Sequence, residues 1–152
     1  MFGSMKRGAN AYANIGVETG VVAASPHKLI TMLFDGALVA IALGKKHMSE
    51  GNIKDKGESV TKAILIIDNG LRASLNKEVG GELALNLDAL YEYMSRRLFE
   101  ANATNNPAIL DEIHGLLDDI RSAWEQIGPN AAQSAPQMAV LQDHSQPSFA
   151  KA

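Results

Sequence analysis

Apolar residues recur at helical spacing through most of this chain, and the clearest run covers residues 26–50. One stripe repeats every four residues and contains Leu29, Leu33, Ala37 and Ile41. A second stripe lies about 100° around the same helix and contains Ile30, Phe34 and Leu38. So wide an apolar arc predicts either the central helix of a bundle or a helix with a second surface for a partner.

Local signals mark where this helix begins and ends. Ser25 can accept a hydrogen bond from a free backbone amide one turn later, and Pro26 suits the first helical position. Gly51 and Asn52 supply a left-handed cap and a break. The sequence therefore predicts a helix from Pro26 to about Glu50.

Three further segments have the same periodicity, at about residues 53–75, 82–103 and 107–127. The last begins at Asn106 and Pro107, a cap followed by a first-turn proline, and ends at Gly128 and Pro129. Short connections between long helices favour antiparallel neighbours. We therefore expect an all-α, antiparallel, up-and-down four-helix bundle over residues 25–128.

Apolar residues at two places in the chain do not fit a single buried helix face. Four consecutive apolar residues, Ile64, Leu65, Ile66 and Ile67, must point in every direction around the second helix. Leu85 lies off the apolar stripe of the third helix. Either neighbouring helices surround these side chains, or some of them form an exposed groove.

The two ends of the chain differ in composition from the middle. Residues 1–24 are interrupted by glycines but carry Tyr12, Ile15 and several valines, so we expect a flexible arm that docks on the bundle or frays. Residues 129–152 are rich in Ala, Gln, Ser and Pro, which predicts a disordered tail.

Glycines also interrupt the predicted helices, at positions 36, 44, 57, 70 and 115. Each costs about 0.5–1 kcal/mol relative to alanine inside a helix. Close approach of another backbone would justify them, and bent or frayed helix segments would explain them equally well.

Composition narrows the classes of function. The 152 residues carry a net charge of −3, so no basic field for nucleic acid or anionic lipid is present. The absence of cysteine excludes disulfides and thiolate chemistry. No run of eighteen uncharged apolar residues occurs, so we expect a cytoplasmic protein without membrane insertion.

The residue patterns disfavour an enzyme, a cofactor or a metal. A dimetal bundle needs inward glutamates and two Glu-x-x-His pairs, but only Asp111 with His114 comes close to that spacing. Neither a Gly-x-Ser-x-Gly nucleophile motif nor a phosphate-binding loop is present. His27, His47 and His114 are interpreted as helix-surface residues.

Several long motifs, in order, resemble the bacterial flagellar export chaperones of the FliS type. They include the arm Tyr12-Ala-Asn-Ile-Gly-Val and the run Ala24-Ser-Pro-His-Lys-Leu-Ile-Thr-Met-Leu-Phe-Asp-Gly-Ala, together with residues 62–71, 80–98, 101–102 and 124–127. The resemblance covers nearly all of residues 12–127.

This resemblance implies a helical bundle that holds newly made flagellin in the cytoplasm. Members of the family bind the helix-forming C-terminal segment of flagellin, prevent its premature polymerisation and help deliver it to the export gate of the flagellar type III secretion system. Their arm can cover part of the client surface and bears on the contact with the export-gate membrane protein, which here points to Tyr12 and Ile15. The candidate partner-binding residues are Tyr12, Ile15, Ile30, Phe34, Leu65, Ile66 and Leu85.

Two other classes of function stay open at this point. A metal-dependent bundle enzyme would contain bound metal after purification. A self-associating helical scaffold would close its surplus apolar surface on a second copy of the chain.

Overall fold

The computed structural model describes residues 25–134, with side-chain surroundings for residues 25–128. The predicted arm and most of the predicted tail lie outside these residues. The described part contains no strand and four long helices, α2 (Pro26–Glu50), α3 (Ile53–Ile66), α4 (Lys77–Thr104) and α5 (Pro107–Ser134). The predicted all-α class is confirmed.

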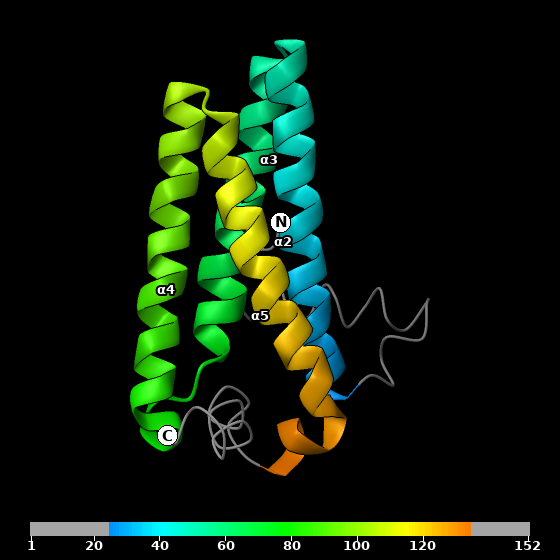
Figure 1. Ribbon diagram of the computed structural model, residues 1–152, viewed down its shortest axis with the longest axis vertical. Coiled ribbons are helices and arrows are strands. Elements are labelled where there is room, and N and C mark those ends of the chain that lie inside the picture. The colour runs from blue at the N-terminus through cyan, green and yellow to red at the C-terminus, as the bar shows by residue number, and fades with distance from the viewer. Residues whose placement is uncertain (1–24, 135–152) are drawn as a thin grey trace.

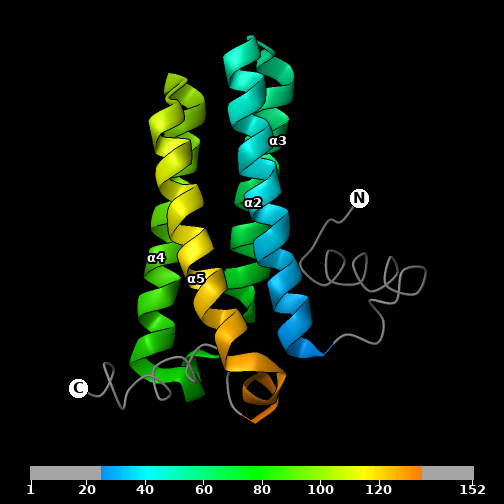
Figure 2. The same cartoon turned by 45° about the vertical axis from the view of Figure 1, so that its right-hand side comes forward.

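The four helices run antiparallel to their sequence neighbours around a shared core (Figure 1). Helix α2 packs against α3 and α5, and α4 packs against the same two helices from the opposite corner. A turned view shows the four helices as two neighbouring pairs, α2 with α3 and α4 with α5 (Figure 2). The up-and-down bundle predicted from the short connections is therefore confirmed.

Helix α2 has the predicted bounds because its caps are local. The Ser25 hydroxyl accepts a hydrogen bond from the Lys28 amide at 3.1 Å. Gly51 adopts a left-handed conformation, with φ of 76°, and its amide bonds the carbonyl groups of the last turn. Both features were readable from the sequence.

Helix α2 is also long and apolar enough to cross a membrane, judged by length and composition alone, and it is the one such helix among residues 25–134. Half of that apolar window is buried inside the bundle. The buried positions are core residues that include Phe34, Ala37 and Ile41. A long apolar helix at the centre of a core accounts for this composition.

The core is continuous through all four helices and is built mainly from aliphatic side chains. Its largest fully buried members are Trp124, Tyr91, Phe34, Ile41, Ile67, Leu71, Met94, Leu98, Leu110, Ile113, Leu117 and Val60. Large residues from every helix thus meet in one cluster.

The second predicted helix differs from the structure after Ile66. A π-helical segment, η2 (Ile67–Leu71), and a 3-10 turn, η3 (Arg72–Ser74), replace its last turns. In this segment a Cβ atom added at Gly70 would come within 3.0 Å of the Leu33 side chain on α2. The Ser74 hydroxyl donates to the Gly70 carbonyl at 2.7 Å. Packing against α2 thus accompanies the wider helical turn.

Helix α4 begins earlier than predicted. Asn76 caps a first turn by accepting from the Val79 amide at 3.1 Å, and Gly81 then takes a non-helical conformation with φ of 60°. The chain therefore kinks at Gly81 after one helical turn. The main body of the helix follows from Glu82, the start that was predicted.

Helix α5 shows the same behaviour at its other end. It starts at Pro107, where Asn106 accepts from the Ala108 amide at 3.0 Å, and it kinks at Gly128 with φ of 75°. Residues 129–134, predicted as the beginning of the tail, continue as helix beyond this kink. The rest of the predicted tail lies outside the described residues.

The interpretation of His27 as a surface residue is wrong. Its ring is buried and stacks on Trp124, with ring centroids 4.7 Å apart. His27 Nε2 lies 2.8 Å from the Trp124 carbonyl, and Trp124 Nε1 donates to the His27 carbonyl at 3.0 Å. His27 sits in the first turn of α2, where the spacing alone does not show that the last turns of α5 pass alongside it.

The helix glycines fall into two groups by what surrounds them. A Cβ at Gly44 would lie 3.0 Å from Val60 Cγ2, so this glycine allows α2 and α3 to approach closely. Gly70 has the comparable contact with Leu33. At Gly57 and Gly115, by contrast, an added Cβ would meet nothing within 4 Å.

Candidate partner-binding face

The structure separates the seven predicted partner-binding residues. Leu65 and Leu85 are 52% and 55% exposed, as a binding surface requires. Ile30, Phe34 and Ile66 lie in the hydrophobic core instead, where they pack within the bundle. Tyr12 and Ile15 lie outside the described residues.

The run of four apolar residues explains this separation on α3. Ile66 and Ile67 are buried and Ile64 is partly buried against the core, whereas Leu65 points outward. Successive residues turn by about 100° around a helix, so the four side chains point in different directions. Neighbouring helices surround three of them, and Leu65 is left exposed.

Leu65 and Leu85 belong to a larger apolar surface, which we call the α3–α4 face. It carries four large exposed side chains, Ile53, Leu65, Leu85 and Phe99, with Ile53 69% and Phe99 66% exposed. Two lie on α3 and two on α4. Large apolar side chains gathered on one side of a soluble chain are typical of a binding surface.

Polar contacts fix which side of α4 is turned toward α3 and toward the η2 and η3 segments that follow it. Asp88 bonds Arg72, Ser95 donates to Asp68, and the Asn102 carbonyl accepts from Lys56. Phe99 lies four residues after Ser95 and three before Asn102, so it occupies the adjacent outer position on the same side.

Leu85 lies three residues before Asp88 and fourteen before Phe99 on the same side of α4. At about 1.5 Å per residue the two side chains are roughly 21 Å apart along the helix. The α3–α4 face is therefore long enough to accept several turns of a partner helix.

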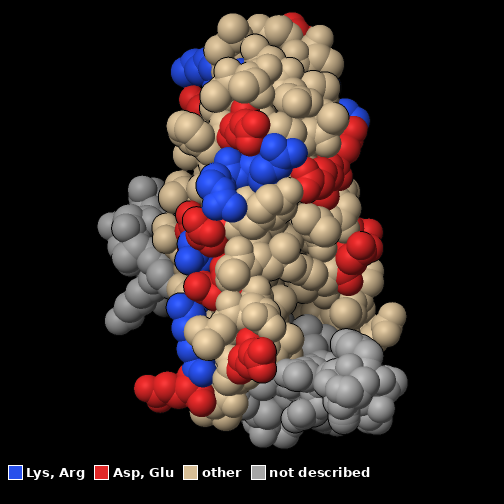
Figure 3. Space-filling view, turned by 60° about the vertical axis from the view of Figure 1, so that its left-hand side comes forward, with Lys and Arg blue, Asp and Glu red and all other residues tan. Residues whose placement is uncertain are grey.

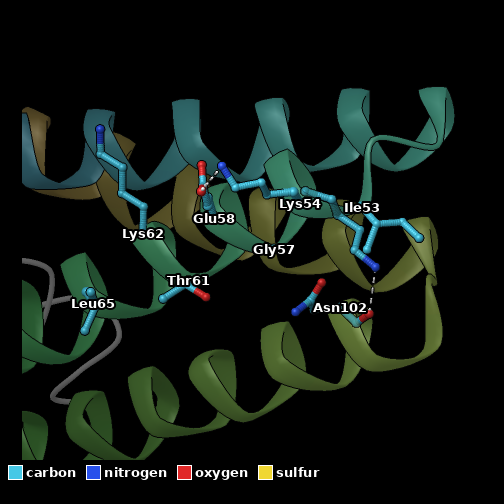
Figure 4. Close-up of a pocket in the computed structure, with 9 residues that line it drawn as sticks. Ile53, Lys54, Gly57, Glu58, Thr61, Lys62, Leu65 and Asn102 are labelled. Atoms are coloured by element: carbon cyan, nitrogen blue, oxygen red, sulfur yellow. Dashed lines mark hydrogen bonds and ion pairs between the residues drawn. The ribbon is translucent and has the colours of Figure 1, made fainter.

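A groove of about 910 Å³ runs along α3 on this face (Figure 4). Residues of α3 form most of it, and α4 contributes Asn102. The lining consists of Ile53, Lys54, Lys56, Gly57, Glu58, Thr61, Lys62, Leu65 and Asn102. Thr61 and Asn102 lie between the two helices, and Lys54, Glu58 and Lys62 extend along the outer edge of α3 (Figure 4).

Lys56 holds the end of the groove in place. Its side chain is buried, and Nζ donates to the Asn102 carbonyl at 3.0 Å and to Asn105 Oδ1 at 2.5 Å. Both acceptors lie at the C-terminal end of α4, where the helix dipole favours a cation. This ammonium group therefore ties α3 to α4 beneath the groove.

An ionic cluster joins η2 and η3 to α4 at the opposite end of the face. Arg72 pairs with Asp88 at 2.9 Å and with Asp68 at 3.3 Å, and Lys77 pairs with Asp88 at 3.3 Å. The hydrogen bond from Arg72 lowers the pKa of the Asp88 carboxyl below its usual value, with Lys77 acting in the same direction. The cluster braces η3 against α4.

The boundary between α4 and α5 is more polar than the α3–α4 face. Arg97 pairs with Glu112 at 3.0 Å and with Glu100 at 2.9 Å, and the Tyr93 hydroxyl donates to Glu112. These bonds from Tyr93 and then Arg97 lower the pKa of the Glu112 carboxyl. A space-filling view shows positive and negative groups side by side across one face of the bundle, with uncharged surface around them (Figure 3).

Sequence reasoning missed Ile53 and Phe99 as exposed members of the face. Phe99 could have been found, because it repeats the off-stripe position of Leu85 after four turns of α4. Ile53, at the first position of α3, had no such signal.

Helix α2 carries a second, smaller apolar strip on its outer side. Leu29, Val39 and Leu43 are exposed there and lie within about 80° of one another around the helix. Most of the wide apolar arc of this helix is therefore core, and a strip remains outside.

Within residues 25–128, no three His, Asp or Glu side chains come together as a group that could hold a metal ion. Asp111, from the pair whose spacing came closest to a metal motif, forms an ion pair with Lys45 on α2 at 2.8 Å.

Comparison with known proteins gives a consistent result across most of the chain. The model of the family described as flagellar protein FliS matches residues 8–131. A flagellar secretion chaperone FliS of Salmonella typhimurium strain LT2 is 50% identical over 125 residues, which cover 82% of this chain and 93% of the relative. The protein of the same name from Escherichia coli strain K12 is 48% identical over 120 residues, covering 79% and 88%. A more distant relative with that name, from Bacillus subtilis strain 168, is 36% identical over 109 residues, covering 72% and 80%. The chain thus belongs to the FliS family of flagellar secretion chaperones.

Proposed function

We propose that this protein binds the C-terminal helical segment of flagellin in the cytoplasm, prevents its premature polymerisation and assists its delivery to the export gate of the flagellar type III secretion system. The protein acts by binding and carries out no catalytic step. The observation that carries the proposal is the α3–α4 face, an exposed apolar surface on a chain of the FliS family.

The shape of this face suits a helical client. An amphipathic helix binds by laying apolar side chains at helical spacing into a hydrophobic groove. The α3–α4 face offers large apolar side chains near both of its ends, with Phe99 and Leu85 about 21 Å apart along α4. A helix of about fourteen residues spans that length.

The free energy of burial on this face is smaller than the entropy cost of ordering the client, so further stabilisation must come from the client segment itself. Burying the four large apolar side chains of this face yields about 6–12 kcal/mol. Ordering a twenty-residue disordered segment costs about 20–40 kcal/mol of backbone entropy. The client must therefore form helical hydrogen bonds and bury its own apolar face, so that a large area is covered.

A calorimetric titration tests the proposal directly. The full chain is titrated with a peptide of the flagellin C-terminal segment at several temperatures. We expect saturable binding with a large negative heat-capacity change, because apolar surface is buried. Leu65→Asp should weaken binding by about 10- to 100-fold, since a leucine side chain contributes about 1.5–3 kcal/mol when buried.

Leu65 is a better position for this test than Ile66, because Ile66 lies in the core and an aspartate there would disturb the fold. Ser122→Asp places the same added charge at an exposed position of α5 and should leave the affinity unchanged. Sedimentation of each variant tests the alternative. A stable dimer whose sedimentation does not change when the peptide is added would favour a self-associating scaffold and overturn the chaperone proposal.

A further inference from the structure

Gly57 is a helix-interior glycine for which the folded chain itself offers no reason. A Cβ atom at this position would meet no heavy atom within 4 Å among the described residues. At Gly44, by contrast, the same atom would lie 3.0 Å from Val60. Because glycine is unfavourable inside a helix, the close approach of a bound backbone would account for Gly57.

The surroundings of Gly57 show where such an approach would occur. Gly57 lies in the groove one helical turn from Ile53 and one turn from Thr61, and all three residues line it (Figure 4). A missing side chain at the middle of a groove lets another backbone approach closely. The end of the groove is held rigidly by the buried Lys56 contacts with α4.

The groove also has a charge opposite to that of the whole chain. Its lining contains three lysines and one glutamate, a net charge of +2, whereas the chain carries −3. Lys54 pairs with Glu58 at 3.5 Å, and Lys62 has no ion-pair partner among the described residues. A carboxylate on the bound segment would complement Lys62.

On the basis of the proposed function, we infer that the client segment crosses this groove as an amphipathic helix, with its backbone closest to α3 at Gly57 and an acidic side chain facing Lys62. Leu65, which lines the groove, and Phe99 on α4 then flank the same helix along its apolar side.

Gly57→Ala separates this role from a structural one. The added methyl group meets no neighbour in the free chain, so the unfolding midpoint should rise as it does for glycine replacement inside other helices. The affinity for the flagellin C-terminal peptide should nevertheless fall by about tenfold. If the fold itself required glycine at this position, Gly57→Ala would lower the unfolding midpoint and would cause no specific loss of peptide affinity.

Gly115→Ala is the matched control. Gly115 is also a helix-interior glycine with nothing within 4 Å of an added Cβ, but it lies on α5, outside the groove. It should show the same gain in unfolding midpoint and an unchanged affinity for the peptide.

Lys62→Glu tests the charge. It should weaken peptide binding by about tenfold at low salt, and the difference from the wild type should shrink as salt screens the interaction. Lys28→Glu, which reverses an exposed charge on α2 outside the groove, should bind as the wild type does.

The outcomes are distinguishable. Failure of the wild type to bind the peptide would overturn the proposed function and this inference together. Wild-type binding with unchanged affinity in both Gly57→Ala and Lys62→Glu would overturn the inference and leave the chaperone proposal standing. If Gly57→Ala lost affinity and Lys62→Glu did not, the close backbone approach would be supported and the contact between Lys62 and an acidic side chain would be ruled out.

Discussion

The side chains of His27 and Trp124 join the first turn of α2 to the later turns of α5. The two rings stack, and each residue bonds a backbone carbonyl of the other, at 2.8 and 3.0 Å. These residues are 97 positions apart in the chain. One pair of side chains therefore closes the bundle at the end from which the N-terminal residues leave.

Replacing Trp124 by phenylalanine should destabilise the fold by about 2–4 kcal/mol, because a buried hydrogen bond is lost and a cavity remains. Urea unfolding followed by circular dichroism measures this change. Tyr91→Phe is a suitable comparison, since the Tyr91 hydroxyl is buried and finds no hydrogen-bond partner in the described part of the chain. The Tyr91→Phe variant should be as stable as the wild type or more stable. A small effect of Trp124→Phe would contradict the role of the His27–Trp124 pair in holding α2 and α5 together.

Among single residues, exposure could be predicted only where the helical pattern was broken. Leu85 lies outside a clear apolar stripe and is exposed. One of the four apolar residues at 64–67 is exposed as well. Ile30 and Phe34, in contrast, form a second stripe on α2 that could have faced a partner. They are buried because α2 has neighbours on two sides, α3 and α5.

At the level of elements, the junction between η3 and α4 depends on the ionic cluster around Asp88. Arg72 and Lys77 both bond its carboxylate and lower its pKa below the ordinary value of 3.8. A lowered pKa in the folded state means that this carboxylate stabilises the fold above the ordinary pKa and loses that contribution as the pH falls through the folded-state pKa.

Asp88→Asn should therefore lower the free energy of unfolding at pH 7, and the difference from the wild type should shrink below about pH 4. Urea unfolding at a series of pH values measures both quantities. Asp118→Asn is the control, because Asp118 is an exposed residue of α5 outside this cluster. A difference that stayed constant down to pH 2 would contradict the assigned role of the charge.

Element boundaries were predictable where caps are local. Ser25, Gly51 and Asn106 act within a few residues of their own position, and the helix ends they mark were found from the sequence. The π-helical segment η2 was not predicted, because the residues that contact it are distant in the chain. Gly70 in this segment packs against Leu33 of α2, and Ser95 of α4 bonds Asp68.

For the whole molecule, the main feature is that two apolar surfaces remain outside one core. The larger is the α3–α4 face and the smaller is the strip of Leu29, Val39 and Leu43 on α2. Residues 1–24 join the bundle at Ser25, at the same end as the start of α4 (Figure 1). The family resemblance implies that such an arm covers part of the client surface.

Deleting residues 1–24 should therefore raise the affinity for the flagellin peptide and increase the binding of an apolar dye, because a competitor for the surface is removed. Fluorescence titration of the truncated and full-length chains provides both measurements. Deletion of residues 135–152 is the control and should change neither. Equal affinity and equal dye binding in the arm-deleted and full-length chains would exclude shielding by the arm.

The sequence alone determined the helical class, the caps, the up-and-down order of the helices and the family, because periodicity, capping and motif order are local or linear properties of a chain. Tertiary packing decided which apolar residues are core and which are surface, since that depends on which neighbours each helix has. It buried Ile30, Phe34, Ile66 and His27, exposed Leu65, Leu85 and Phe99, and left Gly57 open in a lysine-edged groove. A one-dimensional pattern gives the angle of a side chain around its helix, and only the assembled bundle determines what lies in that direction.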